Sequence, residues 1–154
     1  IRYPRDFAYE YNNNNNFQKI LIGKGKILKK GKKIAFLNLG TRLKKVLEIN
    51  EMIKNHHKLN CTVVDMRFAK PIDTKLIQNL NKTHDIFITI EENAIGGFSS
   101  QVNDFLINKL NKTPKILNFF MKDEFIDQSD IDDQYNKSGI SKELIFDKVS
   151  MLLK

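Results

Sequence analysis

Short apolar runs alternate with longer stretches of helical periodicity along most of the chain. The run at residues 34–39 is almost wholly apolar, which is typical of a strand buried on both faces of a sheet. Similar runs follow at residues 61–64, 86–90 and 115–120. The pattern therefore predicts four core strands separated by other elements.

Between these runs, apolar residues recur at the spacing of one helix face. The first such stripe begins at Leu43, where Thr41 offers an N-cap, and ends at His56, His57 and Lys58. Asp73 is expected to cap a second helix. Three further helices are expected: one capped by Ser99 or Ser100, one with a capping box of Ser129 and Asp132 that ends at Gly139, and one capped by Ser141.

Strands that alternate with helices predict parallel pairing, with helices on both faces. Two apolar runs at residues 19–23 and 26–29 flank Gly23-Lys24-Gly25 and predict a hairpin that adds one antiparallel edge strand. The sequence thus predicts an α/β fold of three layers (αβα) around a mostly parallel five-stranded sheet. Its loops at residues 39–41, 67–73 and 91–99 would then share the edge where ligands or partners bind.

The 154 residues fit one domain, and the single Cys61 excludes a disulfide scaffold. No apolar run reaches the roughly 18 residues that a membrane span needs. The first residue is Ile1, so we expect a piece of a longer protein, with residues 1–18 as a linker from a preceding domain and 19–154 as the domain itself. Asn12 to Asn16 form a homopolymer that predicts a surface loop or disorder.

The formal charge is +8, from 26 basic and 18 acidic residues. Of the basic residues, 22 are lysine and 4 arginine, and Lys, Asn and Ile together make 58 of 154 residues, as A/T-rich codons would produce. We therefore expect dispersed, solvated lysines. The alternative is a basic module for nucleic acid or an anionic surface, which would gather them on one face.

Few residues suggest chemistry on their own. His56, His57 and His84 do not group as metal ligands, Cys61 opens a buried strand, and Gly23 to Lys26 lack the spacing of a phosphate loop. Glu91 and Glu92 end a strand and point to opposite faces, so they form no acid–base pair. Two interpretations stay open for them: a contact to a neighbouring domain, or carboxylates that accept backbone N–H bonds. Gly96 and Gly97 would supply unusual dihedrals or let another backbone approach closely.

Three segments, in this order and spacing, resemble the C-terminal part of the 1-deoxy-D-xylulose-5-phosphate synthase family. They are Arg2-Tyr3-Pro4-Arg5, residues 65–73 (DMRFAKPID) and residues 91–98 (EENAIGGF). The second is shared by transketolase-like enzymes generally, whereas the first and third point to the synthase. Residues 22–25, 34–40 and 123–126 extend the resemblance over nearly the whole chain.

This resemblance implies a homodimeric enzyme with thiamine diphosphate and magnesium. It would join pyruvate to D-glyceraldehyde 3-phosphate, with loss of CO2, for isoprenoid precursors. The cofactors would lie between two preceding domains, so no catalytic, cofactor or metal residue is expected in this fragment, which alone would be inactive. The resemblance carries over one substrate contact, Arg5, to the acceptor phosphate; Asp6 stands where relatives usually have glycine. Arg67, Glu91 and Glu92 would have structural or interdomain roles.

Other interpretations remain open. The chain could come from another transketolase-like enzyme, such as a 2-oxoacid dehydrogenase β-subunit, although the segment Arg2–Arg5 argues against that origin. The chain could also be a purely structural domain that holds a dimer together. We expect no nucleic acid or membrane partner. The Lys/Asn/Ile bias and the asparagine run favour a plastid stroma in a protist, with a bacterial cytoplasm as the alternative.

Overall fold

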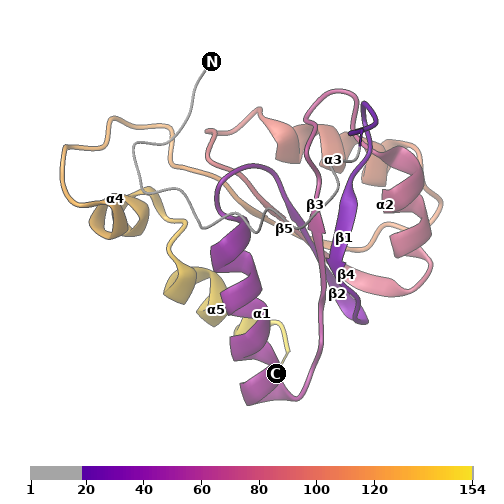
Figure 1. The fold of residues 1–154 in the computed structure, drawn as a ribbon, viewed down its shortest axis with the longest axis horizontal. Coiled ribbons are helices and arrows are strands. Elements are labelled where there is room, and N and C mark those ends of the chain that lie inside the picture. The colour runs from indigo at the N-terminus through magenta and orange to yellow at the C-terminus, as the bar shows by residue number, and fades with distance from the viewer. Residues whose placement is uncertain (1–18, 154) are drawn as a thin grey trace.

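The computed structural model describes residues 19–153, which form a five-stranded sheet between two layers of helices (Figure 1). The strand order is β1-β3-β2-β4-β5. Strands β2 to β5 run parallel, and β1 pairs antiparallel with β3 at one edge. The predicted αβα fold with one antiparallel edge strand is confirmed. The strands are β1 (Lys26–Lys29), β2 (Lys33–Asn38), β3 (Thr62–Asp65), β4 (His84–Ile90) and β5 (Lys115–Phe119).

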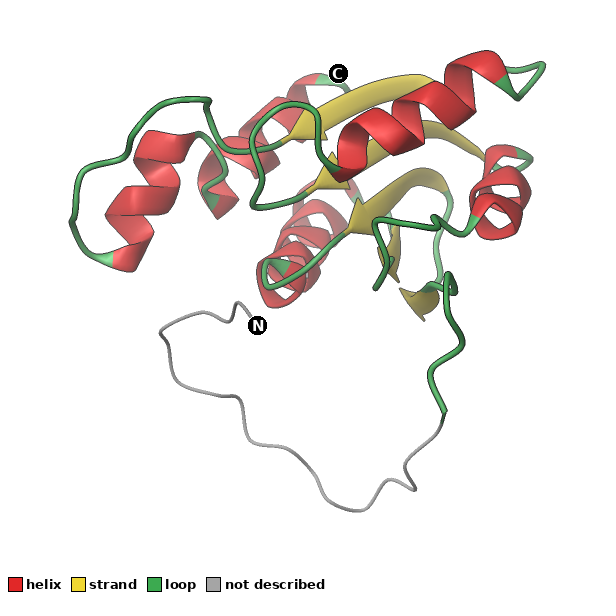
Figure 2. Ribbon diagram, turned by 90° about the horizontal axis from the view of Figure 1, so that it is seen from above, coloured by secondary structure: helices red, strands yellow, loops and turns green. Residues whose placement is uncertain are grey.

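Four helices, α1, α2, α3 and α5, cover the two faces of the sheet, and α4 lies beyond its carboxyl edge (Figure 2). Side chains of α1 and α5 share one buried cluster with alternate strand residues such as Phe36, and side chains of α2 and α3 share the other with residues such as Leu37. Both of these side chains are fully buried, as expected for a strand covered on both faces. The helices are α1 (Leu43–His57), α2 (Thr74–Asn81), α3 (Phe98–Asn108), α4 (Ile131–Ser138) and α5 (Lys142–Met151).

The predicted N-terminal hairpin is wrong. Residues 19–23 form no strand, and Ile20, Leu21 and Ile22 are exposed. A turn does form, but it spans Leu21 to Lys24 rather than Gly23 to Gly25, with the Lys24 N–H donating to the Leu21 carbonyl at 3.2 Å, and β1 takes its partner from β3. A short apolar run shows that an edge strand exists but not which strand it pairs with, because that partner lies more than thirty residues away.

The predicted caps are confirmed only in part. Asp73 accepts from the Leu76 N–H at 3.1 Å, and Gly139 ends α4 with φ of 82°. The cap of α4 is Asp130 rather than Ser129. The N-cap position of α1 is Arg42 rather than Thr41, and α1 has no side-chain cap; the Thr41 hydroxyl donates to Glu92. Ser141 holds the N-cap position of α5 but makes no side-chain cap bond.

In the described part of the chain, no helix has both the length and the apolar character to cross a membrane. Residues 1–18 lie outside the description, so the linker and the asparagine loop stay predictions.

Candidate functional site at the carboxyl edge of the sheet

The loops that follow β2, β3, β4 and β5 meet at one edge of the sheet, as the parallel order requires. Backbone hydrogen bonds join them in sequence across that edge. The Met66 N–H donates to Asn38, the Leu39 N–H to Ile90, and the Glu91 N–H to Phe119, at 2.8–3.0 Å. The edge is therefore a connected surface rather than a set of independent loops.

Glu91 organises the loop after β4. Its side chain is fully buried, and its two carboxylate oxygens accept from the backbone N–H groups of Phe98 and Ser99, each at 2.7 Å. The Asn93 side-chain amide adds a third bond at 3.1 Å. These donors are the free N–H groups of the first turn of α3, where a negative charge is stabilised. Glu91 therefore caps α3 from outside the helix, and the predicted Ser99 or Ser100 cap is wrong.

Two glycines allow this close contact. Gly96 has φ of +96°, a conformation that side chains disfavour. Gly97 has no room for a side chain, because an added Cβ would overlap Oε2 of Glu91. The unusual dihedral predicted for the glycine pair is confirmed at Gly96, whereas the group that closely approaches Gly97 is the Glu91 side chain and not the predicted backbone. Of the two interpretations left open for the carboxylates, acceptance of backbone N–H bonds holds for Glu91.

Glu92 points away from Glu91 and joins three segments of the chain. It accepts from the hydroxyl of Thr41, after β2, and from the hydroxyl of Tyr135, on α4, the latter at 2.5 Å. Burial, and next the hydrogen bond to the Glu92 carboxylate, raises the pKa of Tyr135 above its ordinary value. Glu92 therefore holds α4 against the carboxyl edge.

Arg42 lies under the ring of Tyr135, with its guanidinium carbon 3.7 Å from the ring centroid. The residue is only 5% exposed, and Nη2 donates to the Ile140 carbonyl at 3.2 Å, while Nε has no partner in the described part of the chain. Sequence reasoning assigned no role to Arg42 or Tyr135. The only signal was that Arg42 is one of four arginines in a lysine-rich chain, since its partners are more than ninety positions away.

Asp73 does more than cap α2. Its carboxylate also accepts from the Gly25 N–H at 3.2 Å and from Nζ of Lys24 at 3.4 Å. It thereby fixes the turn before β1 beside the loop after β3. Arg67, in the same loop, has φ of 60° and pairs with Asp65 at 3.6 Å, so its contact within this chain is local.

The same edge carries apolar surface. A cavity of about 350 Å³ is lined by Ala94, Met121, Phe125 and neighbouring residues of the β5–α4 loop. The Phe125 side chain is fully exposed, and Ile95 is 69% exposed. A second, polar cavity of about 150 Å³ lies between Arg42, Tyr135 and the start of α5. Exposed apolar side chains beside a fixed loop are typical of a surface that contacts another domain.

The other candidate residues lie elsewhere. Burial raises the pKa of the Cys61 thiol to about 12, so it is no nucleophile. His84 is buried at the opposite edge, 2.8 Å from the Thr62 hydroxyl, and His57 lies 2.9 Å from the Ser150 hydroxyl. Arg5 lies outside the described residues, so its phosphate contact stays a prediction.

Residues 19–153 do not fit the thiamine diphosphate and magnesium that the resemblance implies. No three His, Cys, Asp or Glu side chains in that range come together as metal ligands. Both oxygens of Glu91 are taken by backbone donors, and Asp73 is satisfied by the β1 turn and α2. What this edge does is hold loops in place and present them outward.

Comparison with known proteins agrees with the fold. The family model of the transketolase C-terminal domain matches residues 23–145. The chain is 39% identical over 151 residues to the 1-deoxy-D-xylulose-5-phosphate synthase of Psychromonas ingrahamii, covering 94% of this chain and 23% of that protein. It is 46% identical over 136 residues to the synthase of Aliivibrio fischeri, covering 83% of this chain and 20% of that protein.

Solved structures show the same architecture. A split-gene transketolase, described as an inactive β4 tetramer, superposes with a TM-score of 0.79 at 28% identity, over 88% of this chain and 44% of that one. A transketolase from Pichia stipitis, at 8% identity and a TM-score of 0.56, covers 85% of this chain and 18% of that one and shares the fold alone. The chain spans about a quarter of the length of its curated relatives. Because the family model covers most of its residues, the chain belongs to the transketolase C-terminal domain family.

Proposed function

We propose that this chain is the C-terminal domain of a 1-deoxy-D-xylulose-5-phosphate synthase. That enzyme would decarboxylate pyruvate and join the remaining two carbons to D-glyceraldehyde 3-phosphate, for isoprenoid precursors. The observation that carries the proposal is the identity of 38–46% to synthases over 83–100% of this chain. Thiamine diphosphate and magnesium would be bound by two preceding domains, and the fragment alone would be inactive.

The carboxyl edge of the sheet would have a structural role in this enzyme, as a docking surface. The loop after β4 is fixed from inside by Glu91, so that Ile95 and the neighbouring Phe125 are presented outward. We propose that this edge docks on the preceding domains of the same polypeptide, in a homodimer. The buried carboxylate would then preserve the shape of an interdomain surface, without touching the substrate.

Arg5 is the proposed substrate contact. A guanidinium binds a phosphate through charge-assisted, often bidentate hydrogen bonds, which are roughly twice as strong as neutral ones. The segment around it, Arg2-Tyr3-Pro4-Arg5, is one of those by which the chain resembles the synthases. In this proposal Arg5 holds the phosphate of glyceraldehyde 3-phosphate while the chemistry takes place on the other domains.

We place the enzyme in a plastid stroma, on the basis of the Lys/Asn/Ile bias and the asparagine run. The relatives named above are bacterial, so a bacterial cytoplasm is the alternative. Targeting of the full-length protein, fused to a fluorescent reporter in its own cells, distinguishes the two.

Complementation tests the proposed function. The full-length gene is expressed in a bacterial strain that lacks its own synthase and needs added 1-deoxy-D-xylulose. We expect growth without the supplement from the full-length gene and none from the 154-residue chain alone. Failure of the full-length protein, where the Aliivibrio fischeri synthase restores growth at equal expression, would contradict the proposal. Growth supported by the fragment would also contradict it.

A further inference from the structure

The edge of the sheet opposite the candidate site carries ten lysines and few carboxylates. In a parallel α/β fold, the amino ends of the strands and the carboxyl ends of the helices meet at one edge. The His57–Ser150 contact places the end of α5 there too, beside the end of α1 (Figure 1). We call the ten lysines of this edge the lysine rim: Lys29, Lys30, Lys32, Lys33, Lys54, Lys58, Lys82, Lys109, Lys112 and Lys115.

The charge of the rim is largely uncompensated. Its two carboxylates, Glu51 and Asp85, pair with Lys54 at 3.7 Å and with Lys112 at 3.0 Å. The other eight rim lysines have no carboxylate partner among residues 19–153. At the carboxyl edge, by contrast, eleven of the sixteen described carboxylates lie among about as many Lys and Arg residues.

The lysines themselves lie at both edges of the fold; what differs between the edges is the number of carboxylates, most of which lie at the carboxyl edge. A codon bias adds lysine to the chain, but it does not choose an edge of the fold. Part of the asymmetry has a local reason, since cations suit the negative ends of helices. That reason does not cover Lys29, Lys30, Lys32 and Lys33, which flank the β1–β2 turn at Gly31.

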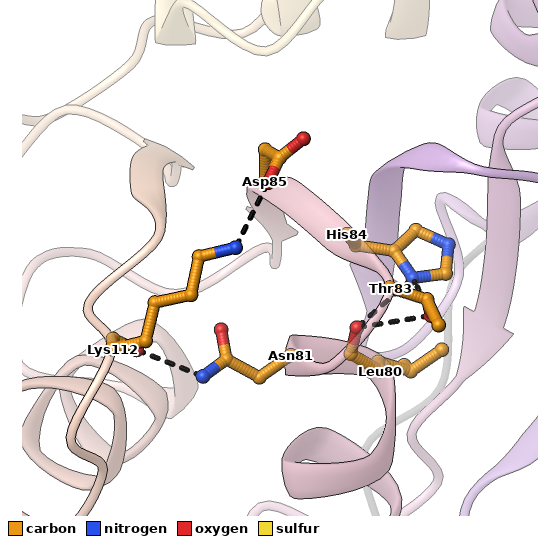
Figure 3. A network of polar contacts seen from close by, with 6 residues as sticks. All are labelled: Leu80, Asn81, Thr83, His84, Asp85 and Lys112. Carbon is orange, nitrogen blue, oxygen red and sulfur yellow. Dashed lines mark hydrogen bonds and ion pairs between the residues drawn. The ribbon is translucent and has the colours of Figure 1, made fainter.

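The rim is built on fixed elements. The Gly31 N–H donates to the Thr62 hydroxyl at 3.0 Å, and an added Cβ at Gly31 would overlap the Asn60 carbonyl. Figure 3 shows the neighbouring part: the Asn81 amide donates to the Lys112 carbonyl at 2.8 Å, and Lys112 reaches Asp85. The lysines thus extend from the β1–β2 turn to the start of β5 at fixed positions.

We propose that the lysine rim is a docking surface for an anionic lipid bilayer. The charges span the whole width of the sheet and line neither of the two cavities described above. This arrangement suits a broad anionic surface better than a single strand of nucleic acid. All of the rim cations are lysine, whereas base recognition favours arginine. Two aliphatic side chains at the same edge, Ile107 and Met151, are 56% and 70% exposed and could enter the headgroup region.

Vesicle sedimentation of the full-length protein tests this inference, which does not rest on the proposed activity. The vesicles contain phosphatidylcholine with 30% phosphatidylglycerol, and the reference vesicles contain phosphatidylcholine alone. We expect binding to the anionic vesicles only, and a steep loss of binding between 50 and 300 mM salt. The test variant changes four rim lysines to glutamine, and the matched control removes the same charge at the opposite edge. The rim set is Lys29, Lys30, Lys32 and Lys33, and the control set is Lys26, Lys70, Lys75 and Lys122.

The rim variant should lose at least tenfold in affinity, and the control variant less than threefold. The double variant Ile107→Ser, Met151→Ser should weaken vesicle binding and leave any binding to duplex DNA unchanged. Equal losses in the two lysine variants would overturn the proposal, because they would show a response to total charge. Absence of vesicle binding, or tighter binding of duplex DNA than of vesicles at the same salt, would also overturn it.

Discussion

The carboxylate of Glu91 accepts a hydrogen bond of 2.7 Å from the backbone N–H of Phe98 while it is completely buried. This bond joins the end of β4 to the first residue of α3, with only the outward-facing loop between them. A buried carboxylate is costly unless its oxygens are hydrogen bonded, and here both are. The shape of the loop therefore depends on one side chain that does not itself reach the surface.

The first prediction concerns Glu91→Gln. One oxygen becomes an NH2 group that faces a backbone N–H, so a charge-assisted bond is replaced by two opposed donors. We expect the free energy of unfolding in urea to fall by about 2–3 kcal/mol. Glu124→Gln, on an exposed side chain with one surface ion pair, should change it by less than about 0.5 kcal/mol. Equal effects of the two substitutions would contradict the role of Glu91 as the cap of α3.

The glycine pair gives a second prediction. Gly96→Ala places a side chain at φ of +96°, which should cost about 1–2 kcal/mol. Gly97→Ala should cost about 3 kcal/mol, because the new methyl overlaps the Glu91 carboxylate. In a Glu91→Ala background the cost of Gly97→Ala should fall, whereas that of Gly96→Ala should not. Additivity of Gly97→Ala and Glu91→Ala in a double-mutant cycle would show that the two residues do not touch.

Tyr135 supplies a pH-dependent prediction. Its pKa in the folded state is raised, by burial first and by Glu92 next, above the ordinary value of 10. The folded state then keeps the phenol proton where the unfolded state releases it, so the stability from this group is complete below pH 10 and is lost as the pH rises through the folded pKa. The free energy of unfolding should fall less steeply above pH 10 in Tyr135→Phe than in the wild type. Identical slopes would exclude this coupling.

Arg5 is tested in the full-length enzyme. Arg5→Ala should raise the KM for glyceraldehyde 3-phosphate by about tenfold or more, because the phosphate loses a charge-assisted contact. The KM for pyruvate should not change, and Arg5→Lys should recover part of the loss. Arg2→Ala serves as the control from the same segment. An unchanged acceptor KM in Arg5→Ala would remove the proposed contact.

The sequence predicted the layers of the fold because its strands and helices carry strong local patterns. The run at residues 34–39 and the stripe that begins at Leu43 became β2 and α1 within a residue or two. The hairpin failed because the partner of β1 is chosen by the sheet, far away along the chain. The predicted cap of α3 failed because the capping carboxylate is that of Glu91, directly after β4 and seven residues before Phe98.

The candidate site was predictable in its loops but not in its contacts. The spacing of Glu91, Glu92 and the glycine pair marked the loop after β4 correctly. The joining of Thr41, Arg42, Glu92 and Tyr135 depends on how α4 folds back over the edge, and no local pattern carries that information. The imbalance of charge between the two edges was missed for the same reason, since charge counts say nothing about position.

The most direct measurement of the central claim is product formation by the purified full-length protein with pyruvate and D-glyceraldehyde 3-phosphate. We expect 1-deoxy-D-xylulose 5-phosphate and CO2 in equal amounts, formed only when thiamine diphosphate and magnesium are present, and none from residues 1–154 alone. A full-length protein that is folded and loaded with cofactor, yet forms no such product or prefers another acceptor, would contradict the assignment.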